Sequence, residues 1–517
     1  MSRRKLFAAA PIAAAAIPLG IPLTTSQRAP NVVDVRSFGA TGDGSTDDSR
    51  AIQAAVAALT PHSVLRFPAG SYRFTERRPA GGAAIALNGL SDVAVEFTPG
   101  AELLMDNLDP ATGTGTSHGV LVEGPASRIA LCNIAVRWAT TGPRSLGDGI
   151  RVQGCPDLGP VAGWTGRPTP VQGISLTDCS VQRSPQTGVV MLGACDITVT
   201  GLSVMNTGAD GLHFNGCRNA TITGHTAIDP GDDGLALVTY FAPEVSFTDE
   251  GTFAFPTLTD WCNADFAITD VEVIGGRANG VRIAGAQRVH LAGLRASGVR
   301  TGAAVMVDSA EPGADDVAWN YLASRGVRLR DVTAAGCETG VHLLARPGSA
   351  GDRRFVDYDV GIDVVRLENC DNWAVRAESL SGPGFSGLLI DDCQVSAAST
   401  SGGNGGVGIS NGHGISLGDV SIRHALPVLA FAVDRATQLR VARLEVFIDT
   451  GDQNIPAATP CVALDDSDGV INAIELAWSG APSSWTALRM SAPKDRDPVT
   501  IGSVTLHTPT GAAGVSG

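Results

Sequence analysis

The sequence predicts an all-β fold, a single-stranded right-handed parallel β-helix. Short alternating stretches rich in Val, Ile and Leu each follow a glycine, and turns rich in Gly, Asn and Asp separate them. The glycines are Gly119, Gly149, Gly188, Gly211, Gly234, Gly280, Gly302 and Gly340. The two intervals from 188 to 211 and from 211 to 234 are both 23 residues, and the interval from 280 to 302 is 22. Such a period with short strands is typical of a solenoid whose rungs stack at ~4.8 Å.

A short helix is expected to cover the N-terminal mouth of the solenoid. Asp47, Asp48 and Ser49 are typical of a helix start, and residues 51–59 have helical propensity and an apolar pattern. From about Val462 onward strands are still expected, but the repeat is weaker.

The cysteines follow the same period as the glycines. Cys195 and Cys217 are 22 residues apart, and Cys370 and Cys393 are 23 apart. Ten cysteines in an exported protein are compatible with five disulfides. The rung spacing favours the alternative, in which small apolar side chains stack inside the solenoid. Each of the two pairs is then predicted to lie on neighbouring rungs, and no spacing suits a zinc site.

The first thirty residues have the pattern of an export signal. Arg3 and Arg4 form a twin-arginine pattern, followed by an Ala-rich apolar stretch to about Leu23. We therefore expect a twin-arginine export signal at 1–30, one β-helix domain at 31–517, and a protein secreted or placed on the cell-envelope exterior. No other segment reaches the ~18 apolar residues of a membrane span.

The charge balance excludes some partners and mechanisms. The net charge of -15 argues against a nucleic-acid partner, which needs a basic surface. Beyond the leader the only lysine is Lys494, so mechanisms that use a catalytic lysine are disfavoured. We expect no cofactor and no required metal. The oligomeric state stays open.

Stacking places the residues that precede the repeat glycines in one column. These are Asp148, Thr187, Asp210, Asp233, Asn279, Thr301 and Thr339. Asp210 and Asp233 should lie on adjacent rungs, with Asp232 in the same turn as Asp233. Crowded carboxylates raise one another's pKa, which leaves a protonated acid beside an ionised base. That pairing is the minimum requirement for glycoside hydrolysis.

A second column lies three residues further along the chain. It contains Arg151, Val190, His213, Ala236, Arg282, Ala304 and His342. Alternation turns His213 and Arg282 outward, beside the acids. The interval from Gly234 to Gly280 is 46 residues, about two rungs. Its additional residues carry the aromatics Tyr240, Phe241, Phe247, Phe253, Phe255 and Trp261. These rings either form a cleft wall on which sugars stack or pack as a small core that holds the loop.

Residues 38–48, 51–55 and 67–72 resemble the N-terminal motif of the pectate-lyase and polygalacturonase superfamily of β-helix proteins. The resemblance implies the fold, which hydrolases, lyases, epimerases and phage tailspikes share. The acidic residues of this motif, Asp43, Asp47 and Asp48, are interpreted as turn and cap residues.

Residues 206–212 and 231–237 are similar to motifs of polygalacturonase-type hydrolases. This resemblance implies that Asp210, Asp232 and Asp233 are catalytic, in an inverting mechanism. The chain departs from the family's pattern: two residues separate Thr207 from Asp210, Asn279 stands in the column of the family's histidine, and the family's lysine has no counterpart. Residues 412–414, Gly-His-Gly, match the family's histidine motif but lie too far along the axis, so we interpret them as structural.

The sequence therefore predicts an exported glycoside hydrolase acting on an oligo- or polysaccharide. Predicted substrate-binding residues are His213, Arg282, Asn279, Tyr240 and Trp261. Asp233 or Asp210 is expected to be the general acid, with an acid–base separation of ~6.5–9.5 Å. One alternative is a lyase or epimerase of the same fold, with Ca²⁺ on the aspartates and Arg282 or His213 as the base. Another is a non-catalytic carbohydrate-binding protein.

Overall fold

The computed structural model describes residues 31–158, 168–241, 254–255, 258–259, 261–314, 319–397, 404–450, 460–509 and 515–516. The predicted export signal at 1–30, and the aromatic residues Phe247 and Phe253, lie outside these residues. Among the described residues, no helix is long and apolar enough to cross a membrane.

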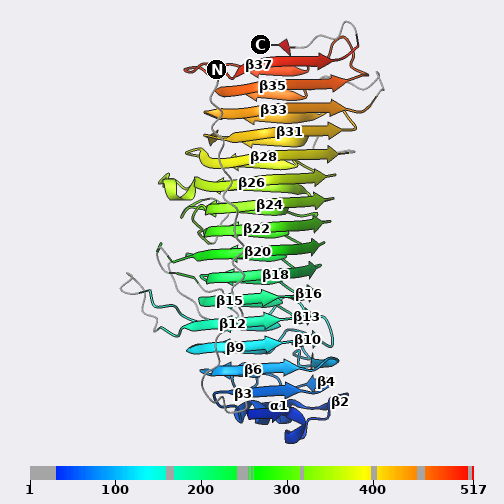
Figure 1. Ribbon diagram of the computed structural model, residues 1–517, viewed down its shortest axis with the longest axis vertical. Coiled ribbons are helices and arrows are strands. Elements are labelled where there is room, and N and C mark those ends of the chain that lie inside the picture. The colour runs from blue at the N-terminus through cyan, green and yellow to red at the C-terminus, as the bar shows by residue number, and fades with distance from the viewer. Residues whose placement is uncertain are drawn as a thin grey trace, which may run out of the picture.

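The chain winds into a tall column of stacked rungs, with the N-terminal helix at one end and β37 near the other (Figure 1). The described strands form two sheets, of 23 and 15 strands, here called sheet 1 and sheet 2. Strands on successive rungs pair in parallel. The structure is therefore a right-handed parallel β-helix, as the sequence predicts.

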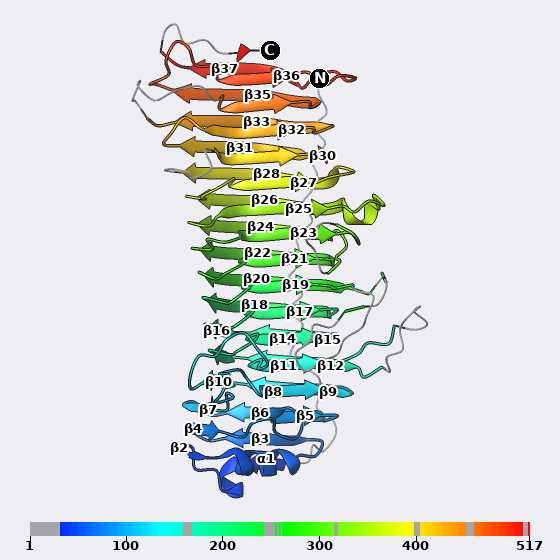
Figure 2. The same ribbon diagram turned by 180° about the vertical axis from the view of Figure 1, so that it is seen from behind.

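Sheet 2 has one strand on each rung (Figure 2). Its strands are β5 (Ala83–Asn88), β8 (His118–Glu123), β11 (Ile150–Gln153), β14 (Val189–Leu192), β17 (Leu212–Asn215), β19 (Leu235–Val238), β21 (Val281–Ala284), β23 (Ala303–Ala310), β25 (Thr339–Arg346), β27 (Val375–Ser379), β29 (Asn404–Ser410), β32 (Leu429–Asp434), β34 (Val462–Asp465), β36 (Leu488–Ser491) and β38 (Val515–Ser516).

Sheet 1 supplies the rest of each rung. Its strands are β1 (Asn31–Asp34), β2 (Asp43–Asp47), β3 (Ser63–Phe67), β4 (Gly70–Phe74), β6 (Ser91–Phe97), β7 (Ala101–Met105), β9 (Ala126–Cys132), β10 (Ala135–Trp138), β12 (Val171–Thr177), β13 (Ser180–Gln182), β15 (Ala194–Thr200), β16 (Ser203–Met205), β18 (Arg218–Ile228), β20 (Asn263–Ile274), β22 (Ala286–Ser297), β24 (Arg325–Ala335), β26 (Asp357–Glu368), β28 (Phe385–Ala397), β30 (Gly412–His413), β31 (Ser416–His424), β33 (Leu439–Ile448), β35 (Gly469–Trp478) and β37 (Thr500–His507). On the rungs that precede β18, sheet 1 has two short strands per rung. The longer strand β18 takes the place of both, because it pairs with β15 along its first half and with β16 along its second.

Alternation along the short strands builds the core. In β17, Leu212 and Phe214 are fully buried and point inward. Leu212 pairs with Val189 on the rung before and with Leu235 on the rung after, so like side chains stack in columns. Each such side chain contributes about 1.5–3 kcal/mol when buried. The rungs continue in this way through β38, including the region after Val462 where the repeat in the sequence is weak.

The N-terminal mouth is covered as expected. A 3₁₀ helix, η1 (Val35–Phe38), and the helix α1 (Ser49–Ala57) lie there, and Ile52 and Ala55 of α1 are buried. Asp48 accepts hydrogen bonds from the backbone N–H groups of Thr41 and Gly42 and so closes the glycine turn. The second 3₁₀ helix is η2 (Arg353–Phe355).

The ten cysteines all lie in the described part of the chain and form no disulfide. Eight are buried and two are half-buried. Cys195 and Cys217 lie on neighbouring rungs, but the strand partner of Cys195 is Arg218, one residue further on. Cys393 pairs with Val365 rather than with Cys370. The cysteines therefore serve as small buried side chains without forming exact columns.

The predicted columns need one correction. Val281 pairs with Val305, which places Asn279 opposite Ala303 and Arg282 opposite Met306. Thr301 and Ala304 were expected at these two positions. The chain turns two residues later than the glycine interval indicates, so Gly302 belongs to the turn rather than to the start of the strand.

Candidate active site

A ladder of side chains fixes the turn that precedes the strands of sheet 2. Oδ1 of Asp210 accepts a hydrogen bond from the backbone N–H of Asp233, 3.0 Å away. Oδ1 of Asp233 accepts from the backbone N–H of Asn279 at 3.0 Å and from its Nδ2 at 2.8 Å. Oδ1 of Asn279 in turn accepts from the N–H of Ala303. Each rung is thus joined to the next, and one oxygen of each acid carries the connection.

The three acids predicted from the sequence meet at one point. One carboxylate oxygen from each of Asp210, Asp232 and Asp233 lies within 4.8 Å of the other two. All three line a small cavity of about 100 Å³ beside sheet 2. Asp210 and Asp233 are buried, whereas Asp232 is half-buried. The expected separation of ~6.5–9.5 Å between acid and base is wider than the distance between these oxygens.

Asp210 is held as a carboxylate. Burial favours its neutral form, but Nδ1 of His213 bonds to Oδ2 of Asp210 at 2.9 Å, and the N–H of Asp233 bonds to the other oxygen. Together these bonds keep the pKa of Asp210 below its usual value. Asp210 is therefore a poor proton donor. Of the two residues expected to serve as the general acid, Asp233 remains.

Asp233 has the opposite environment. Burial and then the negative charge of Asp210 raise the pKa of Asp233 to about 7, although Arg282 opposes this change. The group is 3% exposed and lines the cavity. A carboxyl group with such a pKa is protonated at mildly acidic pH and can donate a proton.

Asp232 is paired with an arginine that the sequence analysis missed. Nη1 of Arg144 donates to Oδ2 of Asp232 at 2.7 Å. Burial and the charge of Asp210 raise the pKa of Asp232, and Arg144 counteracts them. Arg144 lies in the connection between β10 and β11, 88 residues before Asp232. No motif or period marks it.

Arg282 is anchored by a second residue that sequence reasoning missed. Asp308 is 1% exposed and accepts from Nε and Nη2 of Arg282 at 3.0 and 2.8 Å. Arg346 donates to the same carboxylate at 2.8 Å. The guanidinium of Arg282 also lies over the ring of Tyr321, 5.1 Å from its centre. Arg282 reaches the cavity as predicted, and its guanidinium is held in place by Asp308 and the ring of Tyr321.

The aromatic residues divide between the two roles considered for them. Tyr240 lines the cavity, and its ring is stacked on that of His213 with centres 6.0 Å apart. Trp261 instead packs beside the small core of Phe241 and Phe255, and its Nε1 donates to the backbone oxygen of Gly216 at 2.7 Å. The prediction that Trp261 binds substrate is therefore not supported by its position, because it does not line the acid cavity.

Asn279 also has a different position from the one expected. Its side chain bonds Asp233 and the backbone of Ala303 and is not among the residues that line the cavity. Its place in the structure is that of a support for Asp233. His213 lines the cavity, although its Nδ1 is engaged by Asp210.

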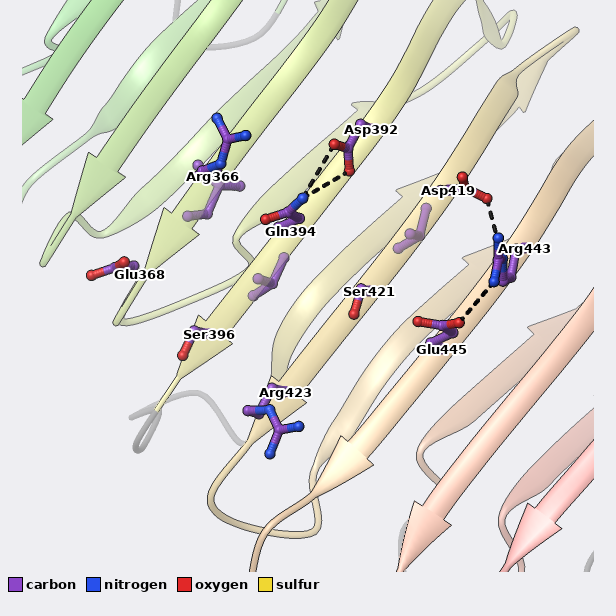
Figure 3. A pocket seen from close by; sticks show the side chains of 13 residues that line it. Arg366, Glu368, Asp392, Gln394, Ser396, Asp419, Ser421, Arg423, Arg443 and Glu445 are labelled. Carbon is purple, nitrogen blue, oxygen red and sulfur yellow. Dashed lines mark hydrogen bonds and ion pairs between the residues drawn. The ribbon is translucent and has the colours of Figure 1, made fainter.

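Larger hollows lie elsewhere on the described part of the surface. A groove of about 770 Å³ shares Arg144 with the acid cavity and runs over the turns that contain Asn206, Asp229 and Arg277. Another, of about 580 Å³, lies over β26, β28, β31 and β33 of sheet 1 (Figure 3). In the second hollow, Arg443 bonds Asp419 and Glu445, and no lining residue is aromatic. We place the candidate active site at the acid cavity.

The histidine of the Gly-His-Gly sequence lies elsewhere. His413 is exposed in β30 of sheet 1, and its Nδ1 lies 2.7 Å from Oγ1 of Thr437. It belongs to a turn contact, in agreement with the structural interpretation.

The acids do not fit a calcium site well. Four of their six carboxylate oxygens already accept hydrogen bonds from this chain. Arg144 and Arg282 add positive charge beside them, which disfavours a divalent cation. We therefore derive no step that passes through a metal ion.

The fold and the cavity define a parallel β-helix protein with a carboxylate cluster on the outer face of sheet 2. Over residues 32–78 the sequence matches the family described as Rhamnogalacturonase A/epimerase, pectate lyase-like. This match confirms the resemblance found at the N-terminal motif. A search of curated proteins finds no match.

Several solved structures are similar to this chain at low identity. The catalytic unit of a thermostable GH87 alpha-1,3-glucanase from Streptomyces thermodiastaticus is 16% identical, with 95% of this chain and 71% of that chain covered and a TM-score of 0.46. A family 28 exopolygalacturonase from Yersinia enterocolitica is 12% identical, with 93% and 79% covered and a TM-score of 0.35. The A-module of the mannuronan C-5 epimerase AlgE6 from Azotobacter vinelandii is 14% identical, with 92% and 100% covered and a TM-score of 0.44.

Proposed function

We propose that the protein is a carbohydrate-active enzyme, a glycoside hydrolase that uses Asp233 as its general acid. The observation that carries this proposal is the contrast between two neighbouring carboxyl groups. Asp233 is buried with its pKa raised to about 7, while Asp210 beside it is held ionised. A protonated and an ionised carboxyl group at one cavity are what acid–base cleavage of a glycosidic bond requires.

Each acid then has a role. Asp233 gives its proton to the oxygen of the leaving sugar as the bond from that oxygen to the anomeric carbon breaks. A water molecule attacks the anomeric carbon and loses a proton to Asp232, while Asp210 helps to hold the water. His213 lowers the pKa of Asp210, and Arg144 opposes the rise in the pKa of Asp232 that burial and the charge of Asp210 cause. Proton transfer by such positioned groups contributes about 10²–10⁴-fold to a rate.

The family match at residues 32–78 supports the carbohydrate-active class. The twin-arginine pattern at Arg3 and Arg4 supports export, and we propose that the protein works outside the cytoplasm. Direct attack by water predicts inversion at the anomeric carbon. The acids lie close together, nearer the ~5–5.5 Å typical of retaining enzymes, so the anomer released first is an informative measurement.

The proposal is tested by incubating the purified protein with a panel of polysaccharides. Reducing ends and ultraviolet absorbance are read in parallel, with the Asp233→Asn variant as the control. New reducing ends without absorbance, lost in the variant, are the expected result. Absorbance from an unsaturated product would instead identify a lyase. Binding of a glycan without any product would favour the carbohydrate-binding alternative.

A further inference from the structure

The acid cavity continues toward the N-terminus of the solenoid, below Asp210. Gln186 and Thr187 line this part, on the rung of β14, next to Val190. Thr187 occupies the same column as Asp210 and Asp233. Gln186 therefore precedes Thr187 in its turn as Asp232 precedes Asp233, two rungs further toward the C-terminus. Two rungs correspond to ~10 Å along the axis.

Gln186 carries an unused acceptor. The side chain is half-buried at the cavity, and its Oε1 has almost no exposed surface and no hydrogen-bond partner, so the amide must turn before a ligand can donate to that oxygen. The backbone around it is fixed, because the carbonyl of Gln186 accepts from the N–H of Ala209 at 3.0 Å. A buried amide oxygen without a partner destabilises the fold, and a ligand group that donates to it recovers this free energy. A hydroxyl group donates; a carboxylate or sulfate does not.

The charges that line the cavity are already balanced by groups of this chain. Three arginines and four aspartates line it, and Asp233 is the protonated acid of the proposed function, so three aspartates remain to match the three arginines in charge. Each arginine is paired: Arg144 with Asp232 at 2.7 Å, Arg151 with Asp148 at 3.0 Å, and Arg282 with Asp308 at 2.8 Å. No excess positive charge remains at the cavity to meet an anionic sugar. Placing another carboxylate beside three aspartates would cost free energy.

We infer that this cleft binds an uncharged glycan, and that the side-chain oxygen of Gln186 accepts a hydroxyl hydrogen from the sugar on the N-terminal side of the acids. The inference deepens the proposed function by naming the substrate class. It sets this chain apart from enzymes that hold a sugar carboxylate with unpaired basic residues. Gln186 is then a specificity-determining residue, because a buried acceptor left without its donor rejects ligands that lack the hydroxyl group.

The test measures binding first, so that it does not depend on hydrolysis. Asp233→Asn protein is titrated with neutral glycans (amylose, dextran and galactomannan) and with anionic ones (polygalacturonate, alginate and carboxymethyl-amylose). We expect at least one neutral glycan to bind more tightly than every anionic one. Failure of all three neutral glycans to bind, or tighter binding of an anionic glycan, overturns the inference.

A second arm tests Gln186 itself. Gln186→Met keeps the shape of the side chain and removes the buried polar group, and Gln182→Met at an exposed position of β13 is the matched control. We expect Gln186→Met to weaken binding of the neutral glycan about 10- to 100-fold. We also expect its Tm to stay level or to rise by about 1 to 3 °C, because an unpaired acceptor has been removed. Unchanged binding, or weakened binding together with a lower Tm, overturns the role of Gln186.

The two proposals fail in different ways. If the unsubstituted protein binds a neutral glycan through Gln186 but releases no reducing ends, hydrolysis is wrong and the substrate class stands. If it releases reducing ends only from an anionic glycan, hydrolysis stands and the substrate class is wrong.

Discussion

Asp210 accepts a hydrogen bond from the backbone N–H of Asp233, 3.0 Å away, so the ladder that joins two rungs also joins two acids of the site. The bond fixes both carboxyl groups relative to the solenoid, and its polarity favours the ionised form of Asp210. The charge of Asp210 in turn raises the pKa of Asp233. One structural contact therefore separates the pKa values of two acids that are chemically identical in the unfolded chain.

Asp233→Asn is expected to abolish most activity and to stabilise the fold at high pH. Turnover should fall by about 100-fold or more, because asparagine keeps the size but cannot donate an acidic proton. The folded pKa of about 7 lies above the unfolded value, so in the unsubstituted protein the stability that Asp233 contributes is lost as pH rises through about 7. The Tm of the variant should therefore exceed that of the unsubstituted protein at pH 8 but not at pH 4. Equal Tm differences at the two pH values would contradict a buried acid at this position.

His213→Gln is expected to move the acidic limb of the pH–rate profile to higher pH. The bond from Nδ1 of His213 lowers the pKa of Asp210, so its loss allows Asp210 to take up a proton at a higher pH. Activity then begins to fall earlier as the solution is acidified. Phe241→Leu, in the small aromatic core, serves as a control for packing. A uniform loss of turnover at every pH would show that His213 acts in another way.

Chelation is expected to leave activity unchanged. Arg144 already occupies one oxygen of Asp232, and both oxygens of Asp210 accept hydrogen bonds from the chain. Dialysis against EDTA followed by the reducing-end measurement checks this expectation. Complete loss of activity that Ca²⁺ restores would favour the lyase or epimerase.

The fold could be predicted because the glycine and apolar period directly encodes the stacking of rungs. The two-residue shift in strand register between Gly280 and Gly302 could not be predicted. A turn that is two residues longer leaves the glycine interval almost unchanged while it shifts the strand register. The same limit explains why Ala304 was placed opposite Arg282 instead of Met306. Local spacing fixes the strands, whereas the length of each turn depends on what the turn packs against.

The site could be predicted only for the residues that belong to the columns. Asp210 and Asp233 are visible because their interval equals one rung. Arg144 and Asp308 contact the site from 88 and 26 residues away along the chain. In its column Asp308 pairs with Ala284, so nothing in the pattern marks that position as polar. Partners that neutralise a buried charge are specified by three-dimensional contact, which a period of 23 residues does not describe.

Asp308→Asn is expected to lower the stability of the fold and to move the alkaline limb of the pH–rate profile to lower pH. Asp308 is buried between Arg282 and Arg346, and removal of its charge leaves two arginines with one acceptor. Breaking such a buried pair costs about 3–5 kcal/mol of unfolding free energy. Asp449→Asn, at an exposed pair with Arg423, should change stability by about 0–1 kcal/mol and is the control.

The pH–rate profile distinguishes a role of Asp308 in positioning Arg282 from a role in stabilising the fold alone. Arg282 already lowers the pKa of Asp233, and without Asp308 its guanidinium is no longer held from behind. It can then approach Asp233, lower that pKa further, and cause the protonated acid to be lost at a lower pH. Arg346→Gln leaves the pair between Arg282 and Asp308 intact, so it should fold even if Asp308→Asn does not, and its alkaline limb should not move. An alkaline limb that is unchanged in Asp308→Asn, or shifted in Arg346→Gln, would mean that Asp308 stabilises the fold without setting the acidity of the site.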